Sequence, residues 1–177
     1  MKTLKQHIDE ALKIGKNLSE WSSYSCQPTT KDELIEIIRD RISKEGLNCD
    51  LNDIDVSLID DMSYLFYMSK FNGDISNWDV NNVKNMKYMF CFSKFNGDIS
   101  KWNTSNVENM CCMFGESKFD NDISNWDVSK VKDMLGMFVD ANFNQNISNW
   151  KIKKNCDAAN MFLNCPIKEE YKPKLPK

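Results

Sequence analysis

One segment of this chain occurs four times at a constant spacing. Its copies are KFNGDISNWDV at 70–80, KFNGDISKWNT at 94–104, KFDNDISNWDV at 118–128 and NFNQNISNWKI at 142–152. A constant period of this length, with no insertion, is typical of solenoids, in which each coil is one structural unit stacked on its neighbours. The spacing therefore predicts a stack of coils that share a single interior.

Apolar residues recur at fixed positions of the repeat and define the predicted core. The columns are Phe66, Phe90, Phe114, Phe138 and Phe162; Phe71, Phe95, Phe119 and Phe143; Ile75, Ile99, Ile123 and Ile147; Trp78, Trp102, Trp126 and Trp150; and Met62, Met86, Met110 and Met134. A single coil buries too little apolar surface to offset the conformational entropy that its ordering costs. Stacking must supply the rest, and we expect edge-to-face aromatic contacts to contribute.

The spacing inside one coil suggests its local structure. Residues 75–83 carry apolar residues in a leucine-rich-repeat spacing, with Trp78 and Val80 on one side of a short strand. Residues 83–90 place apolar residues at helical spacing, which predicts a helical turn on the return path, with Ser105 and Ser129 as N-caps in later coils. Glycines at 73 and 97 are expected in left-handed turns.

These features predict an α/β solenoid, a leucine-rich-repeat-like right-handed stack of about four and a half 24-residue coils. Residues 1–48 are expected to form an N-terminal helical cap, with helices over 3–18 and from about 30 to Gly46. Thr30 and Glu33 form a T-x-x-E capping box at the start of the second helix, and Gly46 is its expected left-handed C-cap. The solenoid spans 49–165, and 166–177 is expected to be a frayed tail.

The repeats closely resemble the BspA-like leucine-rich repeats of bacterial surface proteins and lipoproteins. The resemblance covers about residues 50–165 and depends on FNGDISNWDVNNVKNMKYMF and its echoes, with their W-D-V and M-x-x-M-F elements. Larger relatives are surface adhesins that hold host or matrix proteins, so the resemblance implies a binding function. This chain looks like a small member without an export signal, a lipobox or a wall anchor.

Composition narrows the classes of partner. The net charge of −3 and pI of about 5.3 give no basic surface for nucleic acid or for an anionic membrane. The chain has no apolar stretch long enough for a membrane span and no apolar run near its start, so we expect a cytoplasmic protein. Seven cysteines without a C-x-x-C pair are expected to be free thiols in a reducing compartment.

The sequence offers little catalytic chemistry. His7 is the only histidine, which excludes Ser-His, Cys-His and His-metal arrangements, and phosphate-binding glycine loops are missing. We therefore expect no enzyme activity and no cofactor. A column of acids (Asp50, Asp74, Asp98 and Asp122) is interpreted as turn-capping, with a calcium site at Asp74, Asp98 and Asp122 as the alternative.

The remaining candidate site is the solvent side of the predicted strands, whose polar side chains would contact a partner. These residues are Asn77, Asp79, Asn81, Lys101, Asn103, Ser105, Asn125, Asp127, Ser129, Asn149 and Lys151. Tyr64, Tyr67 and Tyr88 are candidate anchors on another face.

The leading hypothesis is a non-catalytic intracellular protein-protein interaction module. A sharper version is a phage or mobile-element inhibitor that binds a host defence protein. The alternatives are an exported bacterial adhesin or structural surface repeat and a calcium-binding repeat module. The sequence leaves the oligomeric state open.

Overall fold

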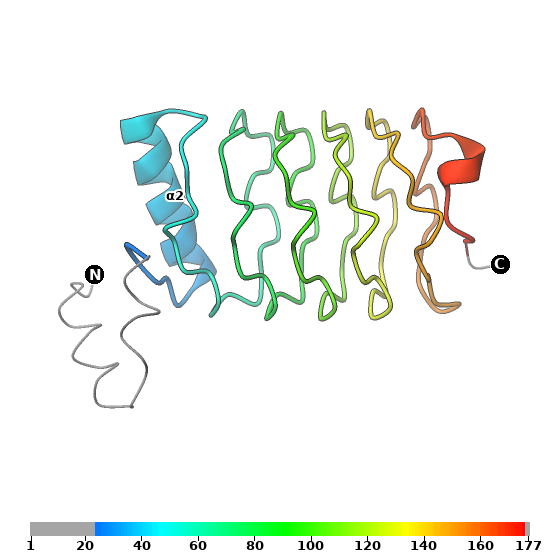
Figure 1. Ribbon diagram of the computed structural model, residues 1–177, viewed down its shortest axis with the longest axis horizontal. Helices are drawn as coiled ribbons and strands as arrows, with labels where there is room; N and C mark the ends of the chain where they lie inside the picture. The colour runs from blue at the N-terminus through cyan, green and yellow to red at the C-terminus, as the bar shows by residue number, and fades with distance from the viewer. Residues whose placement is uncertain (1–23, 176–177) are drawn as a thin grey trace.

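The computed structural model describes residues 24–175, which form a row of similar coils along one axis (Figure 1). Helix α2 (Lys31–Glu45) lies at one end and the 3-10 helix η2 (Glu169–Tyr171) at the other. In this part of the chain, neighbouring coils are joined by isolated parallel β-bridges, and no continuous strand forms.

Successive bridges connect the same position of the repeat in neighbouring coils. One column runs from Asp61 to Asn85, from Asn85 to Asn109, from Asn109 to Asp133 and from Asp133 to Asp157. The sequence period is therefore also the spatial repeat, whereas the leucine-rich-repeat class and the right-handed winding stay predictions.

The aromatic columns form parallel stacks in the core. Phe66 and Phe90 have ring centroids 5.5 Å apart and planes within 2°, and Trp78 and Trp102 lie 6.5 Å apart within 4°. The expectation of edge-to-face contacts between coils was wrong, because equal positions in successive coils hold identical rings in one orientation. All four tryptophans of the column are buried, and Phe162 in the final coil is half-buried.

Polar side chains hold the corners of each coil by accepting a backbone N–H two residues further on. The coil of residues 97–120 has three such bonds. The side chain of Asp98 accepts the N–H of Ser100 at 2.9 Å, that of Asn103 accepts the N–H of Ser105 at 3.2 Å, and that of Asn109 accepts the N–H of Cys111 at 2.9 Å. These are Asx turns, in which a short side chain mimics a backbone turn. The predicted N-cap roles of Ser105 and Ser129 were wrong, because no helix follows either residue.

The return path contains no helix, contrary to the prediction for 83–90. It consists of tight turns in which Tyr88 and Phe92 have φ of 56° and 58°. The N–H of Met86 donates to the carbonyl of Asn109 in the next coil at 2.8 Å. The N–H of Phe90 likewise donates to the carbonyl of Met113 at 2.9 Å. A helix over 83–90 would need this N–H for the carbonyl of Met86, so pairing between coils excludes a helical return.

Gly73 and Gly97 do not have the predicted left-handed conformation; in the described residues the glycines with positive φ are Gly46 and Gly136. Gly73 is needed for space, because a Cβ there would lie 2.0 Å from the carbonyl oxygen of Cys49 and 2.7 Å from the Phe71 ring. At Gly97 the nearest atoms belong to the Phe95 ring, at 2.8 Å.

Helix α2 begins as its capping residues predicted. Thr30 Oγ1 accepts the N–H of Glu33 at 3.2 Å, and the Glu33 carboxylate reaches back to the N–H of Thr29 at 2.8 Å rather than to Thr30. Gly46 has φ of 91° and ψ of 175°, a positive φ outside the left-handed helical region, and its N–H bonds to Ile42. The predicted helix over 3–18, with His7, lies outside the described residues.

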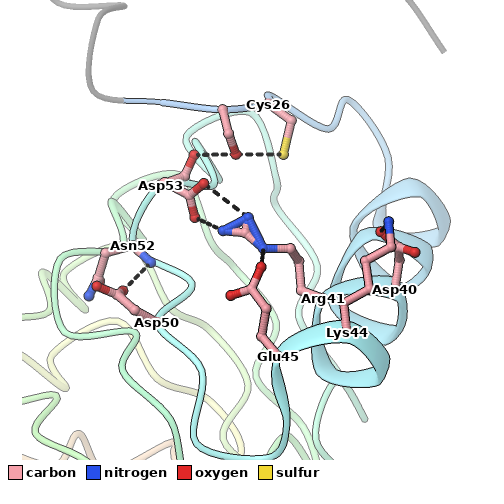
Figure 2. Close-up of polar contacts among 9 residues, drawn as sticks. Cys26, Asp40, Arg41, Lys44, Glu45, Asp50, Asn52 and Asp53 are labelled. Atoms are coloured by element: carbon pink, nitrogen blue, oxygen red, sulfur yellow. Dashed lines mark hydrogen bonds and ion pairs between the residues drawn. The ribbon is translucent and has the colours of Figure 1, made fainter.

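The first coil is tied to α2 and to the segment before it (Figure 2). Arg41 makes a two-pronged ion pair with Asp53, at 3.1 Å for its Nη1. The N–H of Ser25 donates to the carbonyl of Asp53, and Cys26 forms a parallel bridge with Ile54. The stretch before α2 therefore adds a short layer to the stack.

The C-terminal segment also packs on the stack. Ile167 is buried, and the N–H of Ile147 donates to the carbonyl of Tyr171 at 3.0 Å. Because Ile167 and Tyr171 occupy the next phenylalanine and isoleucine columns, residues 165–175 begin a further coil, and the expected fraying does not occur in these residues.

Candidate functional site

The predicted polar face is exposed and runs along successive coils. Nine of its eleven residues are exposed, and Ser105 and Ser129 are half-buried. Stacking at a constant interval places them in three columns, which begin at Asn77, Asp79 and Asn81.

Many of these side chains have structural partners within the chain. Asp79, Asn103 and Asp127 accept the N–H two residues on, at 3.1, 3.2 and 2.9 Å. Asn81 accepts from the Asn103 amide at 2.8 Å, and Asn149 donates to the carbonyl of Ser124 at 2.9 Å. The face is therefore rigid, and part of its polarity stabilises turns.

The other exposed residues of this face make no hydrogen bond or ion pair through their side chains within the described chain. They are Asn77, Lys101, Asn125 and Lys151. Hydrogen bonds from Ser129 hold the pKa of Asp127 below its usual value, with help from Lys130 and Lys153. Asp127 is thus held in its ionised form chiefly by these hydrogen bonds.

The acid column makes the hydrogen bonds that the turn-capping interpretation predicts. Asp74, Asp98 and Asp122 each accept the N–H two residues on, at 2.8 to 2.9 Å. Asn146 does the same at 3.1 Å, although it has no charge. Among the described residues, no group of three or more acids, cysteines or histidines is arranged to hold a metal ion.

A second candidate surface is an exposed aromatic cluster made of Tyr64, Tyr67, Met68, Tyr88 and Phe92. Tyr64 and Tyr88 stack with centroids 5.0 Å apart, and Tyr67 meets Phe92 edge-on at 5.9 Å. Exposed fractions are 49% for Tyr64, 39% for Tyr67, 66% for Met68 and 44% for Phe92. Nine large apolar side chains are exposed in the described chain, and four of them gather here.

The backbone fixes this cluster in place. Tyr64, Met68, Tyr88 and Phe92 all have left-handed φ, between 55° and 61°. Each N–H donates to a carbonyl of the next coil, at 2.9 to 3.0 Å. The rings are thus held on paired backbone rather than on a mobile loop.

The sequence identified the three tyrosines as anchors and missed Met68 and Phe92. Their column continues with Glu116, Asp140 and Asn164, so it has no common side-chain type. The available signal was the adjacency of large apolar residues at two neighbouring copies of an otherwise polar position.

The thiols near this cluster are shielded. All seven cysteines are free, and burial raises the pKa of Cys91 and of Cys111 to about 12. The Cys112 thiol raises the pKa of Tyr88. Cys91, Cys111 and Tyr88 are therefore protonated at neutral pH, which does not suit a nucleophile or a general base.

No helix in residues 24–175 is long and apolar enough to cross a membrane.

Comparison with known proteins gives a family without an assigned activity. Residues 38–118 and 91–171 each match the family described as "Mycoplasma protein of unknown function, DUF285". No curated protein and no solved structure matches the chain.

Proposed function

The chain belongs to the DUF285 family of Mycoplasma proteins, and we propose that it is a non-catalytic module that binds another protein. The observation that carries the proposal is the aromatic cluster of Tyr64, Tyr67, Met68, Tyr88 and Phe92 on a surface that is otherwise mainly polar. Aromatic residues are enriched at the energetic centres of protein interfaces, because they bury a large area with few rotatable bonds.

Rigidity supports the same proposal. The cluster is fixed by hydrogen bonds between coils, so binding would order few side chains and lose little entropy. The resemblance to BspA-like repeats, whose larger members hold proteins, points to the same class of function. The polar face would form a second contact or the rim, since the side chains of Lys101, Asn125 and Lys151 make no hydrogen bond or ion pair within residues 24–175.

Affinity capture with a matched set of variants tests the proposal. The cluster variant combines Tyr67→Ser with Phe92→Asn, because asparagine tolerates the left-handed φ at 92. Leu135→Ser removes an exposed apolar side chain outside the cluster and serves as the control. A second variant, Lys101→Glu with Lys151→Glu, tests the polar face.

We expect the wild type and Leu135→Ser to retain the same proteins from a lysate of the source cell, and the cluster variant to lose them. Purified candidates should then bind the cluster variant at least about tenfold more weakly, the effect of losing one interface hot spot. Equal retention by the wild type and the cluster variant would place binding elsewhere. No specific retention by any form would contradict the proposed function.

A further inference from the structure

Each coil donates hydrogen bonds to the next from one segment, here called the ladder segment. Its copies are residues 62–68, 86–92, 110–116, 134–140 and 158–164. In the first copy, alternate N–H groups donate to carbonyls of the next coil: Met62 to Asn85 at 2.8 Å, Tyr64 to Lys87 at 3.0 Å, Phe66 to Met89 at 2.9 Å and Met68 to Cys91 at 2.9 Å. The next three copies repeat this pattern.

The edge that faces the next coil consists of donors alone. The carbonyls of Met62, Tyr64 and Phe66 accept N–H groups three residues on in their own coil, so they do not point toward the next one. Left-handed φ at Tyr64 and Met68, four residues apart, accompanies this arrangement and recurs at the same positions of the other copies. An ordinary strand edge, in contrast, alternates donors and acceptors.

The last copy leaves this donor edge open. In residues 24–175, the N–H groups of Ala158, Asn160, Phe162 and Asn164 have no acceptor. The C-terminal segment covers a different part of the coil, where Lys168 donates to Asn144 at 3.1 Å and Tyr171 accepts from Ile147. At the opposite end of the stack, α2 covers the first coil (Figure 1), and Lys31 bonds there to Ser63 at 2.6 Å.

The last coil and the segment after it carry a positive net charge. Residues 145–175 contain six lysines and three carboxylates, a net charge of +3. The first coil, 49–72, contains one lysine and five carboxylates, a net charge of −4. Lys172 lies beside the edge, with its Nζ 5.8 Å from the Phe162 ring centroid, and it also forms an ion pair with Glu169.

We propose that the N–H row of Ala158, Asn160, Phe162 and Asn164 binds an extended acidic segment of a protein partner, which lies along the edge as one more ladder segment. The partner supplies carbonyl and carboxylate oxygens as acceptors, and the surrounding lysines favour its negative charge. Two copies of this chain cannot pair through the same edge, because both would present donors only. This inference rests on the proposed protein-binding function and names the chemistry of one partner segment.

Two synthetic peptides provide the probe. One has the sequence Ac-EVEVTEVEVE-NH2, and its matched control, Ac-KVKVTKVKVK-NH2, replaces each glutamate with lysine. Backbone N–H exchange is measured by NMR on the full chain with each peptide. We expect the acidic peptide to slow exchange at positions 158, 160, 162 and 164 by about tenfold or more. Unchanged exchange at these four positions, or equal protection by the lysine peptide, would overturn the proposal.

A backbone change tests the donors themselves. A synthetic segment 156–177 can be ligated to residues 1–155 through Cys156, with an ester in place of the amide N–H of Phe162. Every side chain stays the same. We expect the ester to weaken binding of the acidic peptide about tenfold, as for the loss of one bond to a charged acceptor. An ester at Glu170, whose N–H has no acceptor in the described chain and lies outside the row, should leave binding unchanged.

Lys174→Glu gives a readout that does not depend on ligation, since Lys174 is exposed. We expect weaker binding of the acidic peptide, with a loss that shrinks at high salt. Normal binding by the Phe162 ester would overturn the role of the row. If the peptides fail while the aromatic cluster still captures a partner, this inference fails and the proposed function stands.

Discussion

The indole N–H of Trp102 donates to the carbonyl oxygen of Ile75, in the coil before it, at 3.2 Å. The bond recurs in every tryptophan of the column, from Trp78 to Leu51, from Trp126 to Ile99 and from Trp150 to Ile123. It joins each coil to the preceding one inside the core. Tryptophan therefore provides both the buried ring and a second donor for a buried carbonyl that already accepts a backbone N–H in its own coil.

Trp102→Phe should lower the free energy of unfolding by about 1 kcal/mol, because it removes the indole donor and leaves the buried Ile75 carbonyl with the N–H of Trp78 as its one donor. Urea denaturation of both proteins measures the loss. Phe95→Leu, which removes a ring but no polar group, separates the packing contribution. If Trp102→Phe lost less than about 0.5 kcal/mol, the hydrogen bond would have no stabilising role.

The room for a Cβ atom at Gly73 and at Gly97 differs, and this difference leads to a second prediction. Gly73→Ala should destabilise by about 3 kcal/mol or more, because its Cβ would lie 2.0 Å from a backbone oxygen of Cys49. Gly97→Ala should cost less, because its nearest neighbour is the Phe95 ring and the next is a carbonyl at 3.3 Å. Asn121 and Gln145 already fill this column in later coils. Thermal unfolding of both variants gives the order, and equal losses would contradict this explanation.

The left-handed positions lead to a third prediction. Glu116 has φ of 52° and is exposed, so its side chain adds strain and little packing. Glu116→Gly should raise the free energy of unfolding by up to about 1 kcal/mol, and Glu116→Val should lower it by more than that. Chemical denaturation of the three proteins measures both changes. A stabilising valine would contradict the left-handed conformation.

The core columns were predictable, and the ladder segments were not, for a physical reason. Burial restricts the side chain, so Phe, Trp and Met recur at their columns in the sequence. The ladder instead restricts the backbone: Tyr64, Tyr88, Cys112, Gly136 and Asn160 share one left-handed conformation and no side-chain type. Hydrogen bonds between coils impose that conformation, so helical spacing at 83–90 gave the wrong local structure.

The candidate site was only partly predictable, because some of its polar side chains also have a structural role in the turns. Asp79 and Asp127 had the variable polarity of a recognition surface, but their hydrogen bonds show that they also hold turns. A sequence does not separate these two roles, because a turn and a binding surface both select short polar side chains. Tyr64, Tyr67 and Tyr88 were more informative, since large aromatic rings are not needed at a corner.

Shielding of thiols leads to a fourth prediction. Burial raises the pKa of Cys91 to about 12, so its thiolate is scarce at about pH 8.5, where an unfolded cysteine is about half ionised. Iodoacetamide should therefore modify Cys91 at least about a hundredfold more slowly in the folded chain than in denaturant. Mass spectrometry of the peptide that contains Cys91 follows the reaction. Equal rates in the two states would contradict burial of this thiol.

The acid column leads to a prediction about pH. Hydrogen bonds from Ser100 hold the pKa of Asp98 below its usual value. A carboxylate with a lower pKa in the folded state stabilises the fold above its unfolded pKa, near 4, and this contribution is lost as the pH falls through the folded value. Asp98→Asn keeps an acceptor, as Asn146 does in the same column, and removes the titration.

Asp98→Asn should therefore unfold close to wild type at pH 7 and lose less stability than wild type between about pH 4 and pH 2. Asp98→Ala should be about 1 kcal/mol less stable than wild type at pH 7, because no side-chain acceptor remains for the N–H of Ser100, and this difference should shrink as the pH falls. Urea denaturation across this pH range compares the stability of the three proteins. A calcium chelator added at pH 7 should leave the stability of all three unchanged. A chelator-dependent fall in wild type that is absent in Asp98→Asn would instead support the calcium alternative at Asp74, Asp98 and Asp122.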